Sequence, residues 1–140
     1  MNSILRPLLI ALALCAPLVV APTLAQEVTQ AATTAAPAQV LSFDNEAALD
    51  DLAAKGTTVV FFYASWCPNC RATVTELNQR WDDVRPGLTL VIADYDKEQA
   101  LKAKYGVTYQ DTFVLLDSKG NGVKSWNSGG VDGLNSNTKI

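Results

Sequence analysis

The chain of 140 residues contains no histidine and only three cysteines. Histidine is the commonest metal ligand and the side chain most often used to move protons. A zinc site within one chain would have to combine cysteines with carboxylates alone. Covalent haem attachment is excluded because Arg71, rather than histidine, follows the second cysteine of the pair Cys67 and Cys70. We therefore expect no metal and no organic cofactor.

Basic residues are also few. Lysine and arginine together number 11 against 14 acidic residues, for a net charge of −3, and they form no basic run. Binding to nucleic acid or to an anionic membrane surface depends on clustered positive charge. We therefore expect no nucleic-acid partner.

The first residues form an apolar segment with few charges. Arg6 precedes a nearly continuous apolar run over residues 7–21, and residues 23–25 supply small side chains at a signal-peptidase site. We predict a signal peptide over residues 1–25, cleaved before Gln26. This predicts export to the periplasm or another extracytoplasmic compartment, without stable membrane insertion after cleavage.

Two alternatives for this segment stay open. An uncleaved N-terminus would anchor the protein in the membrane, although Pro17 and Pro22 break the run, which is short for a span of about 20 residues. Lipid attachment would use Cys15, but the bulky Leu14 before it and the apolar run after it oppose that interpretation.

Composition divides the rest of the chain into two parts. Residues 26–39 are rich in alanine, threonine and proline, which predicts a flexible leader. Residues 40–140 are long enough for one modest hydrophobic core, and we predict a single domain there. Export would place that domain where cysteines rarely stay as unpaired thiols.

Predicted strands and helices alternate in this domain, which indicates an α/β fold. Apolar and β-branched runs predict buried strands, and the turn-rich stretch at residues 118–122 predicts a hairpin. Crossovers make most strands of the mixed sheet parallel, and the hairpin gives one antiparallel pair. The predicted strands cover residues 40–43, 57–64, 88–94, 112–117 and 122–127.

Capping signals set the predicted helices. Asp44 would cap a helix that reaches Lys55, and a helix begins at Pro68 with its apolar face at positions 70, 74, 77, 81 and 84. Asp96 and Gln99 resemble a capping box that opens a third helix, which Gly106 closes.

The two cysteines of "SWCPNC" fall where a buried strand meets a helix. A purely structural disulfide would close a very short loop and contribute only about 2 kcal/mol. At the helix N-terminus, free N–H groups and the helix dipole favour a thiolate at Cys67, whereas Cys70 lies one turn into the helix on the inward face. An exposed attacking thiol beside a sheltered resolving thiol suits thiol–disulfide exchange. This favours a redox role over a structural disulfide.

Residues from about 43 to 130 resemble the thioredoxin superfamily. A buried strand, the stretch "ASWCPNC", an amphipathic helix, "KYGV" and a hairpin follow at the family's spacings. The resemblance implies the thioredoxin fold and a dithiol–disulfide oxidoreductase activity. It assigns Cys67 as the nucleophile and Cys70 as the resolving cysteine, with Pro68 and Asn69 between them. Trp66 matches the tryptophan beside the active site, and the alternative for it is a core aromatic residue.

The sequence departs from the family in three places. Phe61 stands where thioredoxins carry a buried aspartate, and Asp111 stands at the cis-proline position before Thr112. A peptide bond before a residue other than proline strongly prefers trans, so the loop geometry is expected to differ. The last residues, "GGVDGLNSNTKI", are short and polar, which predicts a final helix that is shortened or missing.

Several roles for Asp111 are open. Its charge would disfavour a thiolate at Cys67, and its carboxylate could relay the proton that Phe61 cannot accept. It could also be a solvated turn residue. Without the cis-proline, two chains could bridge an iron–sulfur cluster through four thiolates.

The resemblance implies an enzyme that reduces or exchanges disulfides of protein substrates outside the cytoplasm. A membrane thiol-transfer protein is the implied electron donor. The main alternative is a disulfide donor of the same fold, although the uncharged Asn69 between the cysteines argues against a strong oxidant. A non-catalytic binding module of the same fold is the other alternative.

Overall fold

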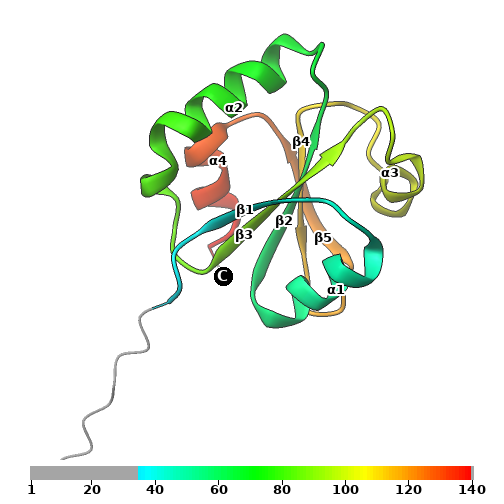
Figure 1. Cartoon of the computed structure of the whole chain (residues 1–140), viewed down its shortest axis with the longest axis horizontal. Helices are drawn as coiled ribbons and strands as arrows, with labels where there is room; N and C mark the ends of the chain where they lie inside the picture. Colours follow the sequence, from blue (N-terminus) through cyan, green and yellow to red (C-terminus); the bar gives the residue numbers. More distant parts are fainter. Residues whose placement is uncertain (1–34, 140) are drawn as a thin grey trace, which may run out of the picture. The chain divides into compact units, whose positions relative to one another are not determined.

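The computed structural model describes residues 35–139, so the predicted signal peptide, Cys15 and most of the predicted leader lie outside it. Strands and helices alternate as expected for an α/β domain (Figure 1). The strands are β1 (Gln39–Ser42), β2 (Thr57–Tyr63), β3 (Leu88–Asp94), β4 (Thr112–Leu116) and β5 (Gly122–Asn127). The helices are α1 (Glu46–Lys55), α2 (Pro68–Arg80), η1 (a 3-10 turn, Trp81–Asp83), α3 (Gln99–Tyr105) and α4 (Gly130–Asn137).

The five strands form one mixed sheet in the order β1-β3-β2-β4-β5. β3 is parallel to both β1 and β2, and β4 and β5 form the predicted antiparallel hairpin. The prediction of a single antiparallel pair was wrong, because β4 also runs antiparallel to β2. The connection through α3 leaves β3 and enters β4 at the same end of the sheet, as the pairings of Tyr63 with Asp94 and of Phe62 with Thr112 show.

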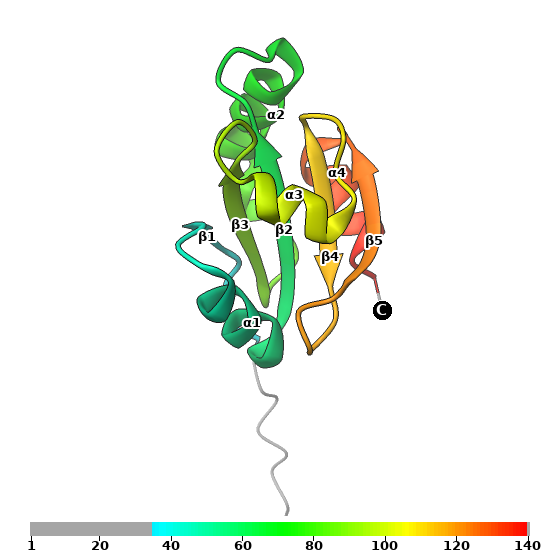
Figure 2. The same ribbon diagram turned by 90° about the vertical axis from the view of Figure 1, so that its right-hand side faces the viewer.

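Helices cover both faces of the sheet. Figure 1 shows α2 and α4 on one side and α1 and α3 on the other, and Figure 2 faces the α1 and α3 side. Successive residues of β2 point to opposite faces, so Phe61 belongs to the cluster under α2 and α4 while Phe62 belongs to the cluster under α1 and α3. Both are fully buried, which confirms β2 as a central strand.

The capping of α1 differs by one residue from the prediction. Asn45, not Asp44, is the N-cap, and its side-chain oxygen accepts the N–H of Ala48 at 2.9 Å. The Asp44 carboxylate instead accepts a hydrogen bond from the Asn45 side-chain amide at 2.8 Å. The amide provides an acceptor for the helix and a donor for Asp44, so both residues contribute to one cap.

The start of α3 also differs from the predicted capping box. The helix begins at Gln99 without a side-chain cap. The side-chain amide of Gln99 donates to the backbone carbonyl of Asp96, and the Asp96 carboxylate does not cap the helix. The carboxylate of Asp94 organises this turn by accepting the N–H groups of Asp96 and Lys97. The predicted stop is confirmed, since Gly106 adopts the left-handed conformation (φ 65°) that glycine tolerates best.

The polar C-terminal stretch forms the short helix α4 of eight residues. It packs against α2 through Val131 and Leu134, which are fully buried. The Glu76 carboxylate accepts the N–H of Val131 at 3.3 Å, and Arg80 pairs with Asp132 at 3.0 Å. The predicted shortening is therefore observed, and polar contacts with α2 secure the remaining turns.

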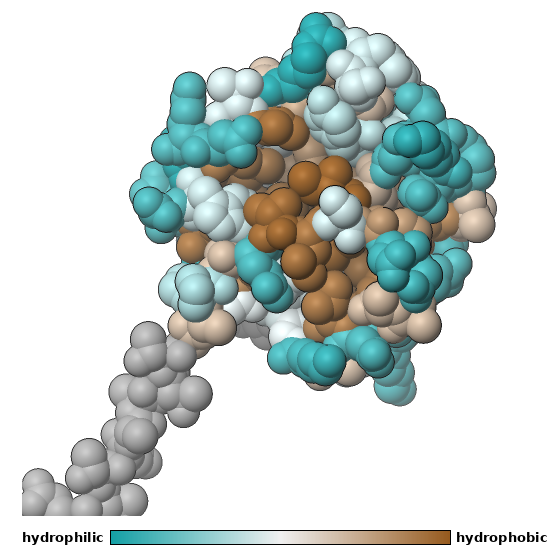
Figure 3. All heavy atoms as spheres, in the orientation of Figure 1, coloured by the Kyte–Doolittle hydropathy of each residue, from teal (hydrophilic) through white to brown (hydrophobic). Residues whose placement is uncertain are grey.

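The first described residues contact the domain ahead of β1. The carbonyl of Ala36 accepts the N–H of Gly87 at 2.6 Å, and that of Ala38 accepts the indole N–H of Trp81 at 3.2 Å. Apolar side chains gather on the face over β1, where Val40 and Leu41 are exposed (Figure 3). Within residues 35–139, no helix combines the length and apolar character needed to cross a membrane.

Candidate active site

The two cysteines of the domain frame the start of α2. Cys67 is the N-cap residue, and its sulfur accepts the N–H of Cys70 at 3.4 Å. Pro68 occupies the first turn of the helix, where its missing N–H removes no hydrogen bond. Both thiols are free, and a hydrogen bond joins their side chains. The stretch Cys–Pro–Asn–Cys thus places two unpaired thiols in contact at a helix N-terminus.

Cys67 is less exposed than the sequence predicts. Only 2% of its surface is accessible, and Cys70 is fully buried. The expectation of an exposed attacking thiol was wrong, because the Cys67 sulfur turns inward to the Cys70 N–H and joins the hydrophobic cluster under α2. The sheltered position of Cys70 is confirmed, and its sulfur accepts the N–H of Ala64, just beyond β2, at 3.5 Å.

The surroundings of Cys67 favour its thiolate. Burial raises the pKa of Cys67, but hydrogen bonds from the Cys70 N–H, the Cys70 side chain and the Asn69 N–H outweigh that effect. The side chain of Gln110 donates another hydrogen bond to the same sulfur. The pKa of Cys67 therefore lies below its ordinary value.

The surroundings of Cys70 favour its neutral thiol. Burial raises the pKa of Cys70 to about 11, although the Ala64 N–H acts in the opposite direction. The charges of Cys67 and Asp111 add to the increase because each would repel a second negative charge. The surroundings thus shift the pKa values of the two cysteines in opposite directions, favouring the thiolate at Cys67 and the protonated thiol at Cys70.

Trp66 is an exposed side chain and not a core aromatic residue. More than half of its surface (56%) is accessible, and its indole N–H donates to the carboxylate of Asp96 at 2.8 Å. This bond ties the residue before Cys67 to the turn between β3 and α3. Tyr109 is likewise exposed, in the loop that leads to Asp111.

Asp111 is buried, so its interpretation as a solvated turn residue was wrong. Its surface is 3% accessible, and its N–H donates to the Phe62 carbonyl at the end of β2 at 3.0 Å. Its backbone is left-handed (φ 60°), a conformation in which Asp and Asn are enriched among residues with side chains. Oδ1 of its carboxylate has no hydrogen-bond partner among the described residues.

Ser128 holds Asp111 in place through two hydrogen bonds, which we call the Asp111–Ser128 clasp. The Ser128 N–H donates to the Asp111 carbonyl at 3.1 Å, and the Ser128 hydroxyl donates to Oδ2 at 2.9 Å. Ser128 is also left-handed (φ 60°). Two unfavourable conformations, each opposed by about 1–2 kcal/mol, are thus stabilised together by mutual hydrogen bonds.

Thr112 lies at the first position of β4, paired with Phe62. Its hydroxyl donates to the Tyr109 carbonyl and accepts from the Asn127 side chain, both at 2.7 Å. These bonds shape the loop that carries Gln110 and Asp111 to the dithiol. Sequence reasoning missed Gln110 and Ser128, because nothing in the local pattern around either residue signals a contact with a distant thiol or carboxylate.

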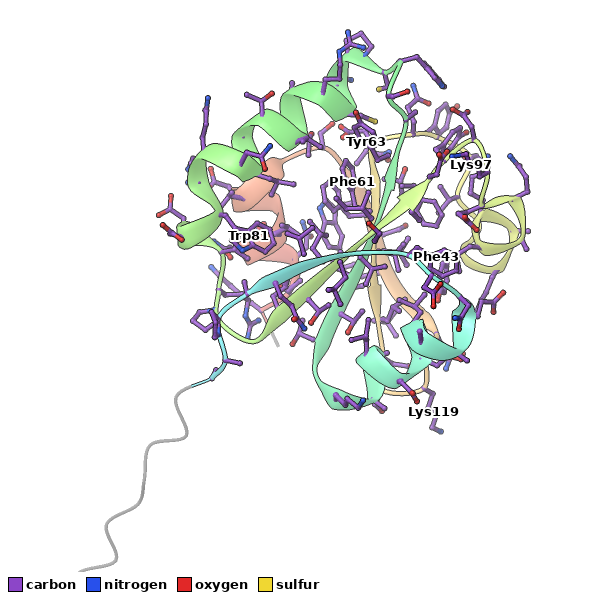
Figure 4. The ribbon with its side chains drawn as sticks, in the orientation of Figure 1. Phe43, Phe61, Tyr63, Trp81, Lys97 and Lys119 are labelled. Carbon is purple, nitrogen blue, oxygen red and sulfur yellow. The ribbon has the colours of Figure 1, made fainter. Side chains whose placement is uncertain are left out.

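Phe61 supplies no proton acceptor beneath the cysteines. Its ring stacks on that of Phe113 at 4.3 Å between centroids, and Phe113 in turn stacks on Trp126 at 5.5 Å. Figure 4 shows Phe61 directed from the sheet toward the α2 and α4 side. The floor of the site is therefore apolar, and Asp111 is the carboxylate whose charge acts on Cys70.

Comparison with known proteins shows the family to which this chain belongs. The thioredoxin family model matches residues 39–138. Thioredoxin Asp f 28 of Aspergillus fumigatus is 32% identical over 80 residues, which cover 55% of this chain and 70% of that protein. Thioredoxin 2 of Plasmodium falciparum is 32% identical over 66 residues, and this chain spans 42% of its length.

Solved structures of thioredoxins share the fold. A thioredoxin variant from Halobacterium salinarum superposes with a TM-score of 0.59 and 26% identity, covering 76% of this chain and 97% of its own. The Trxlp protein of Edwardsiella tarda gives a TM-score of 0.56 at 23% identity, covering 70% and 95%. The mixed sheet and its flanking helices are thus those of the thioredoxin fold, and the chain belongs to the thioredoxin family.

Proposed function

We propose that this protein is an exported thiol–disulfide oxidoreductase that reduces or exchanges disulfides of protein substrates outside the cytoplasm. The observation that carries the proposal is the asymmetry of the dithiol. Hydrogen bonds at the N-terminus of α2 lower the pKa of Cys67, whereas burial raises that of Cys70. Thiol–disulfide exchange needs one thiolate to attack and one protected thiol to resolve the product.

The reaction follows from this asymmetry. The Cys67 thiolate attacks one sulfur of a substrate disulfide, and the other substrate sulfur leaves as a thiolate. Cys70 then loses its proton and attacks Cys67, which forms the Cys67–Cys70 disulfide and releases the second substrate sulfur. The substrate gains two electrons and the protein loses two. Because Cys67 is nearly covered, a substrate must displace neighbouring side chains to reach it.

The reduction potential of the dithiol decides the direction of the reaction. We expect a value near that of thioredoxin, about −270 mV, from equilibration of the protein with glutathione buffers. A value near about −120 mV would instead assign the protein as a disulfide donor. A pair that never equilibrates would refute both directions and leave the non-catalytic binding module.

A matched pair of variants tests the roles of the cysteines. Cys67→Ser should abolish reduction of a protein disulfide such as that of insulin, because the attacking sulfur is lost. Cys70→Ser should instead accumulate a mixed disulfide at Cys67, detectable as an added mass. Substrate binding that persists in Cys67→Ser without any turnover in the wild-type protein would support the binding module.

Export and the electron donor require their own tests. Expression of the full chain should yield an extracytoplasmic protein that begins at Gln26, measured by cell fractionation and mass spectrometry. A retained N-terminus in the membrane fraction would assign residues 1–25 as an anchor, and an unprocessed soluble protein would refute export. A membrane thiol-transfer protein is the expected donor, and Cys70→Ser should trap it as a mixed disulfide.

A further inference from the structure

The step that forms the Cys67–Cys70 disulfide requires removal of a buried proton. Cys70 has no accessible surface, and burial raises its pKa to about 11. At neutral pH very little of this thiol would ionise without a nearby base. Phe61, on the strand beneath, is apolar and cannot serve as one.

Asp111 has a suitable position and an unpaired carboxylate oxygen to accept this proton. Its backbone N–H bonds to the Phe62 carbonyl, and the sulfur of Cys70 bonds to the N–H of Ala64, two residues further along the chain. Both groups are thus anchored at the same end of β2. A buried carboxylate oxygen without a partner is unfavourable by about 1–3 kcal/mol or more, so Oδ1 calls for a functional explanation.

We propose that Asp111 accepts the proton of Cys70 during resolution of the mixed disulfide, and that the Asp111–Ser128 clasp holds its carboxylate for this transfer. The inference rests on the exchange activity proposed above. The proton passes from the Cys70 sulfur to Oδ1, directly or through one water molecule. The Cys70 thiolate then forms the bond to Cys67, and the bond from Cys67 to the substrate sulfur breaks. The leaving thiolate takes up the proton from Asp111 or from solvent.

The groups packed around Asp111 leave Cys70 as its reaction partner. The end of β2 contributes the Phe62 carbonyl, which is already bonded to the Asp111 N–H. The segment after β5 contributes Ser128, whose hydroxyl satisfies Oδ2. α2 contributes Cys70, whose thiol retains its proton and is the group on which the charge of Asp111 acts.

Two roles for Asp111 make opposite predictions for the variant Asp111→Asn. If the carboxylate only repels a thiolate at Cys70, its neutralisation eases ionisation and speeds resolution. If it accepts the proton, its neutralisation slows resolution, by about a hundred-fold for a typical general base. Asparagine also suits a left-handed backbone, so this substitution preserves the loop conformation.

The two chemical steps can be followed separately in one experiment. The reduced full chain is mixed with an aromatic disulfide reagent that releases a coloured thiolate at each step, and the release is recorded by stopped flow. The first phase reports attack by Cys67 and depends on reagent concentration. The second phase reports attack by Cys70 and does not. We expect Asp111→Asn to keep the first phase and its folded state, measured by thermal unfolding, and to slow the second at least about ten-fold.

The pH profile separates proton transfer from a structural role. In the wild-type protein the rate of the second phase should depend only weakly on hydroxide concentration, because Asp111 accepts the proton, whereas in Asp111→Asn the rate should rise with hydroxide concentration. Asp82→Asn, which neutralises an exposed carboxylate on η1, should leave both phases unchanged. A second phase that is unchanged, faster or slowed less than ten-fold in Asp111→Asn overturns the inference. Absence of the first phase in the wild-type protein would refute the exchange activity itself.

Discussion

At the scale of single residues, two cysteines only three positions apart have opposite acid–base properties. Most of the hydrogen bonds that lower the pKa of Cys67 come from groups in the first turn of α2, including the N–H of Cys70, and one comes from the side chain of Gln110. Cys70 lies one turn deeper, where burial dominates. A shift of one pKa unit corresponds to about 1.4 kcal/mol, so small differences in local geometry select which sulfur reacts.

This difference predicts selective alkylation of the reduced protein. Because the thiolate is the reactive form, iodoacetamide should modify Cys67 first at neutral pH. Modification of Cys70, measured in Cys67→Ser by mass spectrometry, should stay slow at neutral pH and increase only in alkaline solution, because burial, the largest cause of its raised pKa, remains in that variant. The same protein unfolded in urea provides the control, in which both cysteines should titrate near the ordinary thiol pKa. Equal rates in the folded wild-type protein would contradict the prediction.

At the scale of elements, α4 shows how a polar segment can form a helix. Its contacts with α2 come from residues about 50 positions earlier in the chain. Arg80 pairs with Asp132 across a separation of 52 residues, and Glu76 bonds to the N–H of Val131. Local patterns in the sequence predicted β2, α2, β3 and the hairpin, because those elements are specified by their own apolar runs. They could not predict how α4 is held, since its partners lie on another helix.

The same limit applies to the site. The cysteines could be assigned from the sequence because their spacing and their place before a helix are local properties. Burial of Asp111 could not, because it depends on Ser128 and on the end of β2. The inward turn of Cys67 also escaped prediction, since it depends on side-chain packing.

The junction between α2 and α4 gives a prediction at this scale. Gly130, the first residue of α4, is left-handed (φ 47°), and a Cβ atom there would overlap the Glu76 carboxylate. Gly130→Ala should lower the free energy of unfolding by about 1–2 kcal/mol, measured by urea denaturation. Ser136→Ala, at an exposed position of the same helix, should change stability by less than about 0.5 kcal/mol. An unchanged stability in Gly130→Ala would show that α4 contributes little to the fold.

At the scale of the whole domain, the sheet separates two hydrophobic clusters that share β2. The cluster under α2 and α4 contains Phe61, Cys67 and Cys70, and the cluster under α1 and α3 contains Phe62. Both phenylalanines are fully buried, so both faces should contribute to stability. Only one of the faces contains the thiols.

Matched substitutions in β2 test this division. Phe61→Leu and Phe62→Leu should each lower the free energy of unfolding by about 1–3 kcal/mol, and each variant should unfold in a single transition. Phe61→Leu should also shift the pH profile of Cys67 alkylation, because it alters packing around the dithiol. Phe62→Leu should leave that profile unchanged. Identical profiles in the two variants would contradict the separation of the faces.

The parallel arrangement of β1, β3 and β2 has a practical consequence for handling the protein. Since these strands run in the same direction and Cys67 follows the carboxyl end of β2, β1 begins at the end of the sheet opposite the dithiol. A domain immobilised through its amino-terminal side, on a bead, a sensor surface or a fusion partner, would present the thiols to the solution. Affinity handles and fluorophores placed ahead of Gln39 are therefore suited to trapping experiments, because they are attached at the end of the domain remote from Cys67 and Cys70.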